Sequence, residues 1–493
     1  MNDATDADDF AYDRVDYPSY VIEAIAPNRL RAAAMLAGRR APDPLHASVL
    51  EIGCGEGINL LAFAAVSPNA RAVGFDLARH AIDRGNELLA RVGLKNVDLH
   101  VGDAVTYPRD GEKFDYIICH GVLTWVPAPV RHAILDLIAA RLAPGGLAYI
   151  SYDCLPGAGP KAAIVPFLRE LTNGITDPRE ATKRGLQGIA LLNRTQSKAS
   201  RLKVQLDTII NDMPEVDATY FYHDWLAEYY EPVDLRKFLP LVQSKGLQIA
   251  GTMSGYELTA EGLEDGARNL IAACGSDVAR KLSLYEVLQG GHIFHRDLFI
   301  RTDAPPEAAP DGVTDLSFAF DGTREEVDSE NGPAIEYALG EKGTLTTQTP
   351  EMIAVIDYLL NAGQREVPYV ELRSETGVAD DVLRKILFLC NSIPIVSVSA
   401  TPQPYVLEPG DRPRIGQLAL ALLKEGRDLL VTLRGKQLDV PQPETQLCLK
   451  LCDGTRTRAE IAAIMNAELQ KPIGEIEVDV AIRHFARMRV FEA

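Results

Sequence analysis

The chain has 493 residues, enough for two or three domains, and its 46% apolar and 24% charged residues are typical of folded globular proteins. A net charge of −19 disfavours nucleic acid as a partner and suits a cationic one. No apolar run approaches the roughly 20 residues of a membrane helix, the acidic start MNDATDADDF is unlike a signal peptide, and seven scattered cysteines form no disulfide pattern. We expect a cytoplasmic protein that is not inserted in a membrane.

The first 155 residues alternate between strand-like and helix-like runs. We expect strands at residues 48–53, 71–76, 96–101, 114–120 and 146–152. The helices between them include residues 78–93 and 129–142, the second ended by the sequence APGG. This alternation predicts an α/β fold with a doubly wound, Rossmann-like parallel sheet. Ligands bind such sheets at the carboxyl ends of the strands.

The sequence VLEIGCGEG, residues 49–57, follows the first expected strand. Gly53, Gly55 and Gly57 allow a sharp turn and let a ligand approach the backbone. Their alternate spacing disfavours an NAD site, which usually has the pattern G-x-G-x-x-G. Asp76 ends the second strand, where a carboxylate can accept hydrogen bonds from ribose hydroxyls.

Four further segments, GFDLA, VGDAVTY, FDYIICHGVLTWV and LAPGGLAYISY, follow in order. Together with the glycine loop they resemble the class I methyltransferases that use S-adenosylmethionine, over residues 48–152. The resemblance implies that the chain binds S-adenosylmethionine. The glycine loop would then contact the methionine part of the cofactor, Asp76 the ribose and Asp103 the adenine, and His120 would lie near the methyl group. The implied cofactor-binding residues are Glu51, Gly53, Cys54, Gly55, Gly57, Asn59, Asp76, Leu77, Asp103, Ala104, His120 and Gly121.

A narrower resemblance covers more of the chain. The segments YDRVDYPSYVIEAIAPNRL, SYDCLPG, FYHDWLAEYYEPV and LCDGTRTRAEIAA are similar to bacterial methyltransferases that carry a methyltransferase regulatory domain. That group includes the rickettsial outer-membrane-protein lysine methyltransferases. The chain has Asp153 and Ala158 where the related pattern tends to have Asn and an aromatic residue.

Methyl transfer from a sulfonium mainly requires positioning and exclusion of water. An amine acceptor must also lose a proton, because lysine is protonated at neutral pH. Candidate catalytic residues are Asp153, Tyr152 and His223, with Tyr222 in the aromatic segment 219–230. Aromatic walls favour cations, so that segment is expected either to line the acceptor channel or to belong to the core.

The known fold adds a helix and two more strands, one antiparallel, which makes a seven-stranded sheet. We assign residues 234–253 and 295–302 to them, and residues 156–302 to a mostly helical insertion or regulatory region that completes the sheet. Residues 1–155 are the methyltransferase core, in which Tyr12 and Tyr17 either form a lid or belong to a plain ordered tail. The Pro- and Ala-rich residues 303–312 predict a linker, and residues 313–493 a winged-helix-like α+β domain. Its excess of acidic residues favours protein interaction or homodimerisation over DNA binding.

We expect no metal site: His292 and His295 stand near a strand, and Cys448 and Cys452 are interpreted as buried core thiols. Three functions remain open. The chain is a protein-lysine N-methyltransferase, a methyltransferase for a small molecule or natural product, or a cofactor-binding regulator without catalysis. The sequence CHGVLTWVP after the fourth strand lacks an Asn-Pro-Pro-Tyr type motif, which disfavours amide and nucleobase substrates.

Overall fold

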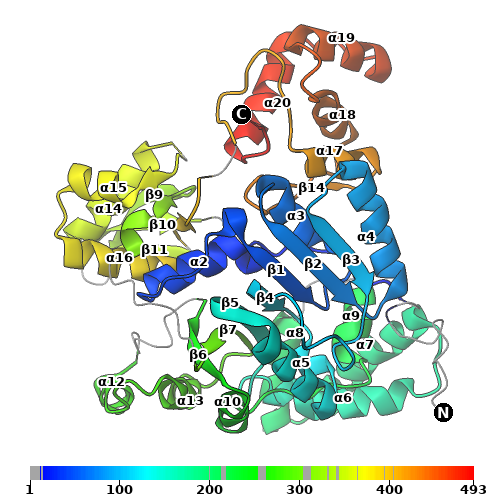
Figure 1. Ribbon diagram of the computed structural model, residues 1–493, viewed down its shortest axis with the longest axis vertical. Coiled ribbons are helices and arrows are strands. Elements are labelled where there is room, and N and C mark those ends of the chain that lie inside the picture. The colour runs from blue at the N-terminus through cyan, green and yellow to red at the C-terminus, as the bar shows by residue number, and fades with distance from the viewer. Residues whose placement is uncertain are drawn as a thin grey trace.

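The computed structural model describes residue 12 and residues 15–198, 200–212, 218–253, 263–303, 312–329, 332–339, 343–363, 365–392, 395–402 and 405–492. A seven-stranded sheet in the order β3-β2-β1-β4-β5-β7-β6 lies at its centre (Figure 1). The sheet consists of β1 (Ser48–Ile52), β2 (Arg71–Asp76), β3 (Val97–Val101), β4 (Phe114–Cys119), β5 (Leu142–Asp153), β6 (Leu247–Thr252) and β7 (Phe294–Arg301).

Strands β1 to β5 pair in parallel, and β7 is inserted antiparallel between β5 and β6. This topology confirms the predicted fold class, including the extra strand pair. Strands β1, β2 and β4 match the predicted ranges closely, because their apolar runs are buried on both faces, the usual pattern of parallel sheets. Strand β5 begins four residues before its predicted range.

Helices cover both faces of the sheet. On one face α2 (Pro27–Leu36), α3 (Ile58–Val66) and α4 (Arg79–Val92) share a hydrophobic core with β1. On the other face α5 (Ala128–Arg141), α10 (Leu235–Ser244) and α13 (Val278–Leu288) form a second core. Short 3-10 helices lie at η2 (Glu23–Ile25), η3 (Pro44–His46), η4 (Leu123–Trp125) and η5 (Gly312–Asp315).

The segment after β5 is helical, as expected. It contains α6 (Gly159–Thr172), α7 (Pro178–Thr195), α8 (Arg201–Asp212) and α9 (Ala218–Trp225), which pack around a small core of their own. Helix α12 (Asp265–Ala272) follows β6 and packs with α13. Most of the predicted linker lies outside the described residues.

Residues 312–492 contain two separate hydrophobic cores, where the sequence predicted one unit. The first core is built by β8 (Ser317–Ala319), β9 (Thr323–Ser329), β10 (Gly332–Ala338), β11 (Thr344–Thr347), α14 (Pro350–Asn361), β12 (Val367–Pro368), α15 (Tyr369–Thr376), α16 (Asp380–Ser392) and β13 (Ser397–Ser399). The second contains α17 (Gln417–Lys424), β14 (Leu429–Val431), β15 (Gln437–Asp439), α18 (Pro443–Leu451), α19 (Arg458–Leu469) and α20 (Glu475–Arg487). The described residues between α16 and α17 contain only β13 and isolated bridges, so no regular element joins the two cores.

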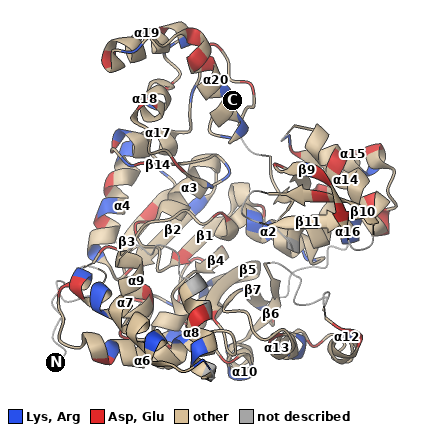
Figure 2. Ribbon diagram, turned by 180° about the vertical axis from the view of Figure 1, so that it is seen from behind, with Lys and Arg blue, Asp and Glu red and all other residues tan. Residues whose placement is uncertain are grey.

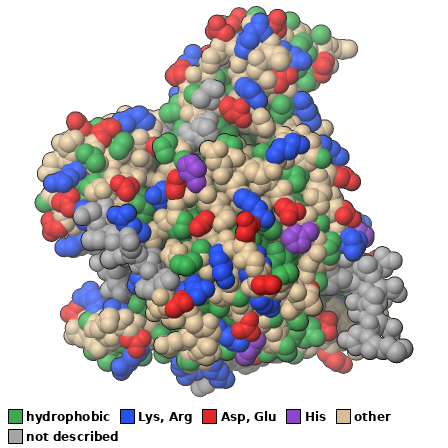
Figure 3. All heavy atoms as spheres, in the orientation of Figure 1, with side chains coloured by type: hydrophobic (Ala, Val, Ile, Leu, Met, Phe, Trp, Pro, Cys, Tyr) green, Lys and Arg blue, Asp and Glu red, His purple; other side chains and the backbone are tan. Residues whose placement is uncertain are grey.

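Both C-terminal units dock against the sheet domain (Figure 1). Ala32 and Met35 of α2 belong to the first C-terminal core, and Leu418 and Leu422 of α17 belong to the core around α3 and α4. Exposed acidic side chains lie along β9 (Figure 2). The face seen in Figure 3 carries acidic and basic side chains side by side.

Two predictions about composition can be compared with the structure. All seven cysteines are free and buried, and Cys448 and Cys452 are core residues of the second C-terminal unit. Within the described part of the chain, every helix is too short or too polar to cross a membrane.

Candidate functional site

The glycine loop between β1 and α3 has the conformation that its sequence predicts. Gly53, Gly55 and Gly57 all have positive φ angles, of 73°, 55° and 71°, a region that side-chain-bearing residues rarely adopt. A Cβ atom on Gly53 would lie 2.5 Å from Val122, whereas a Cβ atom on Gly55 would meet nothing within 4 Å. The backbone at Gly55 is therefore open to a ligand.

Asp76 at the end of β2 fixes this loop. Its carboxylate accepts hydrogen bonds from the backbone N–H of Gly55 (2.8 Å) and of Ala78 (2.9 Å). At the end of β3, the Asp103 carboxylate accepts a hydrogen bond from the Val105 N–H at 2.8 Å. Leu77 is exposed, so the strand ends present two carboxylates and one apolar side chain around the glycine loop.

His120 and Gly121 follow β4 and complete this edge. His120 Nδ1 lies 3.0 Å from the Tyr149 hydroxyl and 3.2 Å from Ser151 Oγ. The Gly121 N–H donates to Ser151 Oγ at 2.9 Å. Burial, with a smaller contribution from Arg296, lowers the pKa of His120 to about 4. The imidazole is therefore neutral near pH 7 and repels a sulfonium cation less than an imidazolium would.

Glu51, Cys54 and Ala104 have buried side chains, whereas Asn59, beside Glu51, is half-buried. Asn59 Nδ2 donates to Glu51 Oε1 at 3.3 Å, and Asn59 Oδ1 accepts from the Ile22 N–H at 2.8 Å. Burial raises the pKa of Glu51 from its usual 4.5 to about 8. Cys54 and Ala104 are buried, so only their backbones can contact a ligand.

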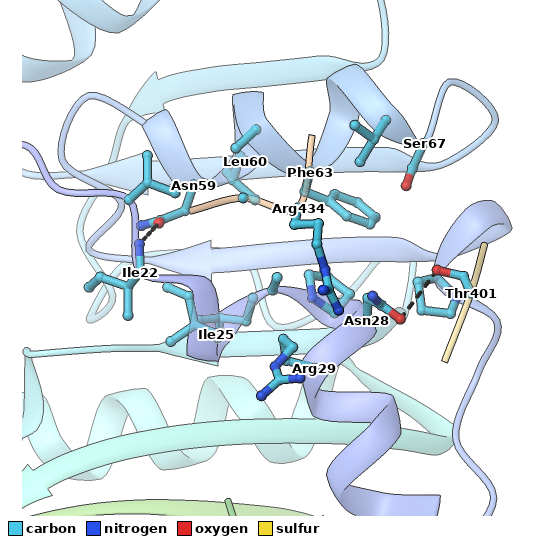
Figure 4. A pocket seen from close by; sticks show the side chains of 18 of the residues that line it. Ile22, Ile25, Asn28, Arg29, Asn59, Leu60, Phe63, Ser67, Thr401 and Arg434 are labelled. Carbon is cyan, nitrogen blue, oxygen red and sulfur yellow. Dashed lines mark hydrogen bonds between the residues drawn. The ribbon is translucent and has the colours of Figure 1, made fainter. Parts of the chain in front are cut away.

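Glu51 and Asn59 line a pocket between α2, α3 and the segment 433–435 (Figure 4). Arg29 and Arg434 lie at this pocket, together with the apolar side chains of Ile25 and Phe63. Thr401 of the first C-terminal unit and Arg434 of the second also line this pocket, so both units contribute to it.

A second group of side chains surrounds the ammonium group of Lys161, close to the end of β5. Lys161 Nζ lies 4.6 Å from the ring centre of Tyr230, 5.2 Å from that of Trp225 and 5.4 Å from that of Trp125. It forms ion pairs with Asp224 (2.7 Å) and Asp153 (3.5 Å). We call Trp125, Trp225, Tyr230, Asp153 and Asp224 the ammonium box.

Hydrogen bonds fix the Asp153 side of the ammonium box. The Tyr230 hydroxyl donates to Asp153 Oδ2 at 2.8 Å, and the Asp153 N–H donates to Thr124 Oγ1 at 2.8 Å. Thr124 belongs to η4, directly after the loop that carries His120 and Gly121. Burial raises the pKa of Asp153, while the Lys161 cation and the Tyr230 hydrogen bond lower it; the net shift is upward. Asp153 is therefore a better proton acceptor than an exposed aspartate.

The structure separates the predicted catalytic residues. Asp153 is in the ammonium box, but Tyr152 points to the opposite side of β5, where it is fully buried and its hydroxyl donates to Asp297. His223 Nε2 donates to the Val15 carbonyl oxygen at 2.8 Å, and Tyr222 packs edge-on against His223. This geometry gives Tyr152 no contact with the box and makes His223 an anchor of the N-terminal segment.

Tyr12 and Tyr17 extend from that segment over α9. The Tyr12 ring stacks on His223 with ring centres 4.2 Å apart, and the Tyr17 ring lies 6.3 Å from that of Tyr220. Burial raises the pKa of Tyr12 to about 12, and the negative charges of Asp76 and Asp224 contribute in the same direction. Tyr12 thus lies near both the cofactor-side carboxylate and the ammonium box.

Sequence reasoning missed Lys161 and Trp125. Lys161 is the single charged residue in the run CLPGAGPKAAIVPFL, residues 154–168, and a lone lysine in an apolar run indicates a buried cation with a partner. The partners could not be read from the sequence, because Asp224 is 63 residues away.

The residues present fit S-adenosylmethionine: the loop at Gly55 is open, and carboxylates stand at the ends of β2 and β3. A family model described as a methyltransferase domain matches residues 49–146. RP028 of Rickettsia prowazekii (strain Madrid E) is 32% identical over 244 residues, which are 48% of this chain and 96% of RP028. RP789 of the same organism is 34% identical over 246 residues, 50% of this chain but only 44% of RP789.

Solved structures show the same fold. PKMT2 from Rickettsia typhi superposes with a TM-score of 0.81 at 19% identity, covering 96% of this chain and 100% of PKMT2. PKMT2 in complex with AdoHcy gives a TM-score of 0.78 at 20% identity, covering 96% of this chain and 99% of PKMT2. The chain belongs to one family with RP028 and, through its methyltransferase domain, to the class I S-adenosylmethionine-dependent methyltransferases.

Proposed function

We propose that this methyltransferase transfers the methyl group of S-adenosylmethionine to the side-chain amine of a lysine in a protein. The observation that carries the proposal is the ammonium box. Its three aromatic rings and two carboxylates already surround one primary ammonium group, that of Lys161. We propose that the ammonium group of the acceptor takes the place of Lys161 there.

The chemistry of the ammonium box suits an amine before and after methylation. Aromatic faces attract a cation through the ring quadrupole, whether or not the cation carries hydrogen-bond donors. The carboxylates attract the unmethylated ammonium group more strongly, because it donates charge-assisted hydrogen bonds to them. A neutral acceptor such as a hydroxyl group can donate a hydrogen bond to a carboxylate but gains little from the aromatic faces.

Asp153 is our candidate for the proton acceptor. An incoming ammonium group must lose a proton before its nitrogen lone pair can attack. Burial of Asp153 raises its pKa, and a desolvating aromatic surrounding lowers the pKa of an amine, so the two groups approach each other in basicity. The bound cofactor supplies an electrophilic methyl group on a sulfonium, and the chain's own residues orient the amine and exclude water.

Two further features support a protein-lysine acceptor. The segments SYDCLPG and FYHDWLAEYYEPV resemble segments of the rickettsial lysine methyltransferases. They contain four residues of the ammonium box, Asp153, Asp224, Trp225 and Tyr230. The net charge of −19 also suits a basic protein substrate. Cytoplasmic location and homodimerisation remain predictions.

The test is transfer of labelled methyl groups from S-adenosylmethionine into a bacterial lysate that is then separated into protein and small-molecule fractions. The matched pair of variants is Asp76→Ala, which removes the carboxylate that fixes the glycine loop, and Asp83→Ala, an exposed aspartate on α4. We expect label in protein, recovered as methylated lysine after hydrolysis, with the wild type and Asp83→Ala but not with Asp76→Ala.

Two outcomes would contradict the proposal. Label found only in small molecules would identify a small-molecule methyltransferase. Cofactor binding by calorimetry without any transfer of label would instead support a non-catalytic regulator.

A further inference from the structure

A second cluster of side chains lies on the opposite side of β5 from the ammonium box. Cys154 directly follows β5, His295 lies on β7, and Glu286 lies on α13. One donor atom of each residue (a sulfur, a nitrogen and an oxygen) lies within 4.8 Å of the other two, and all three residues are buried. Cys154, directly after β5, thus meets two residues that lie more than 130 positions further along the chain, and the three side chains bring three different metal-ligand types to one point.

The His295 imidazole points its Nε2 atom into this cluster. Its Nε2 atom lies 2.9 Å from Glu286 Oε1, in ion-pair range, but among the described residues it makes no hydrogen bond of regular geometry. The His295 side chain is only 3% exposed. A buried polar atom without a regular hydrogen bond is costly. A metal ion between the His295 nitrogen and the Glu286 oxygen would bind both atoms and remove that cost.

The surroundings of the cluster match the outer partners of metal ligands. Asp297 Oδ1 lies 3.6 Å from His295 Nδ1, and the Tyr152 hydroxyl donates to the other oxygen of Asp297. The Glu286 carboxylate accepts hydrogen bonds from the backbone N–H of His292 (2.8 Å) and pairs with His292 Nδ1 (3.0 Å). Metal-bound histidines commonly face a carboxylate with their other nitrogen, and ligating carboxylates are themselves hydrogen-bonded.

We propose that Cys154, Glu286 and His295 bind a divalent metal ion of the zinc class. Zinc accepts sulfur, nitrogen and oxygen ligands together, and in a tetrahedral site its ligand atoms lie roughly 3–4 Å apart. Three protein ligands leave one position for water. The sequence predicted no metal site because Cys154 and Glu286 are separated by more than 130 residues and carry no spacing motif.

The proposed ion ties β7 and α13 to the residue that follows Asp153. Asp153 belongs to the ammonium box and Cys154 follows it in the chain, so the ion would fix the end of β5 from the side opposite to the box. This role is independent of the identity of the methyl acceptor. Metal binding requires that the thiol of Cys154 is reduced, and all seven cysteines of the chain are free.

The experiment uses the full chain, purified under reducing conditions without a metal-affinity tag. Elemental analysis after dialysis into metal-free buffer measures bound zinc, and titration with Co²⁺ measures the absorption that thiolate ligation gives to cobalt. We expect about one zinc ion per chain and a thiolate–cobalt charge-transfer band. Cys154→Ser should abolish that band, and Asp297→Asn should weaken zinc binding about 10- to 100-fold.

The matched control is Cys274→Ser, since Cys274 is also a buried free thiol but lies outside the cluster. It should keep the metal and the band. Because a buried substitution can prevent folding, the wild type alone is decisive: absence of both zinc and the cobalt band would overturn the proposal and leave an ion pair between His295 and Glu286. Zinc that persists unchanged in folded Cys154→Ser and His295→Gln would also overturn it.

Discussion

The Lys161 ammonium group competes with the acceptor if both use the ammonium box. Lys161→Met removes that competitor and leaves Asp153 and Asp224 without a cation. The competing interaction is worth about 1–2 kcal/mol, so we expect the KM for the protein acceptor to fall about 5- to 30-fold. Steady-state methyl transfer measures it, and Lys183→Met, at an exposed lysine on α7, is the control. An unchanged KM with lost turnover would instead make Lys161 an essential part of the site.

Glu51 gives a pH dependence that can be measured. Burial raises its pKa from 4.5 to about 8, so between these values the folded chain holds a proton that the unfolded chain has released. The free energy of unfolding should therefore decrease as pH rises through this range, by about 1.4 kcal/mol per pH unit from this group. Glu51→Gln keeps an oxygen that can accept the hydrogen bond from Asn59 but cannot titrate. The variant should therefore lose this pH-dependent contribution in denaturant titrations at pH 5 and pH 8. An identical pH dependence in the variant would refute the assignment.

At the scale of elements, the N-terminal segment is held across α9 by a few contacts. His223 Nε2 donates to Val15, and Tyr12 stacks on the same imidazole. His223→Phe keeps an aromatic ring but loses the hydrogen bond, worth about 1 kcal/mol. If the segment is a lid, S-adenosylmethionine should dissociate about fivefold faster in stopped-flow measurements. His132→Phe, at an exposed histidine of α5, should not change that rate; an equal rate in both variants would make the segment a plain ordered tail.

At the scale of the whole molecule, a C-terminal unit reaches the glycine loop. Glu56, between Gly55 and Gly57, is buried and pairs with Arg427 at 2.7 Å. Arg427→Ala leaves a buried carboxylate without its main partner, a cost of about 1–3 kcal/mol. We expect weaker binding of S-adenosylmethionine by calorimetry, about fivefold or more, with Arg483→Ala, at an exposed arginine of α20, as the control. Unchanged affinity would show that the Glu56–Arg427 ion pair joins the C-terminal unit to the sheet domain without influencing the cofactor site.

How much the sequence predicted depends on the range of the interactions involved. Strands β1 to β5 and the glycine loop follow from apolar runs and from glycines that adopt positive φ angles, which are local properties. The fold class is confirmed for the same reason. The ammonium box is different, because Lys161 of α6 meets Asp224 of α9 and Asp153 at the end of β5 only when the helical segment packs against the sheet. Likewise, two separate C-terminal cores replace the one predicted unit, since helix and strand patterns do not indicate which elements pack together.

The placement of the acceptor amine in the ammonium box can be tested by comparing methyl transfer by Tyr230→Phe and Tyr229→Phe. Tyr230 donates a hydrogen bond to Asp153 in the ammonium box, while its neighbour Tyr229 is exposed. A hydrogen bond to a charged group is worth about 1.5–3 kcal/mol, so we predict that Tyr230→Phe lowers kcat about tenfold or more. Affinity for S-adenosylmethionine should stay unchanged, and Tyr229→Phe should behave like the wild type. Equal turnover in the two variants would contradict the placement of the acceptor amine in the ammonium box.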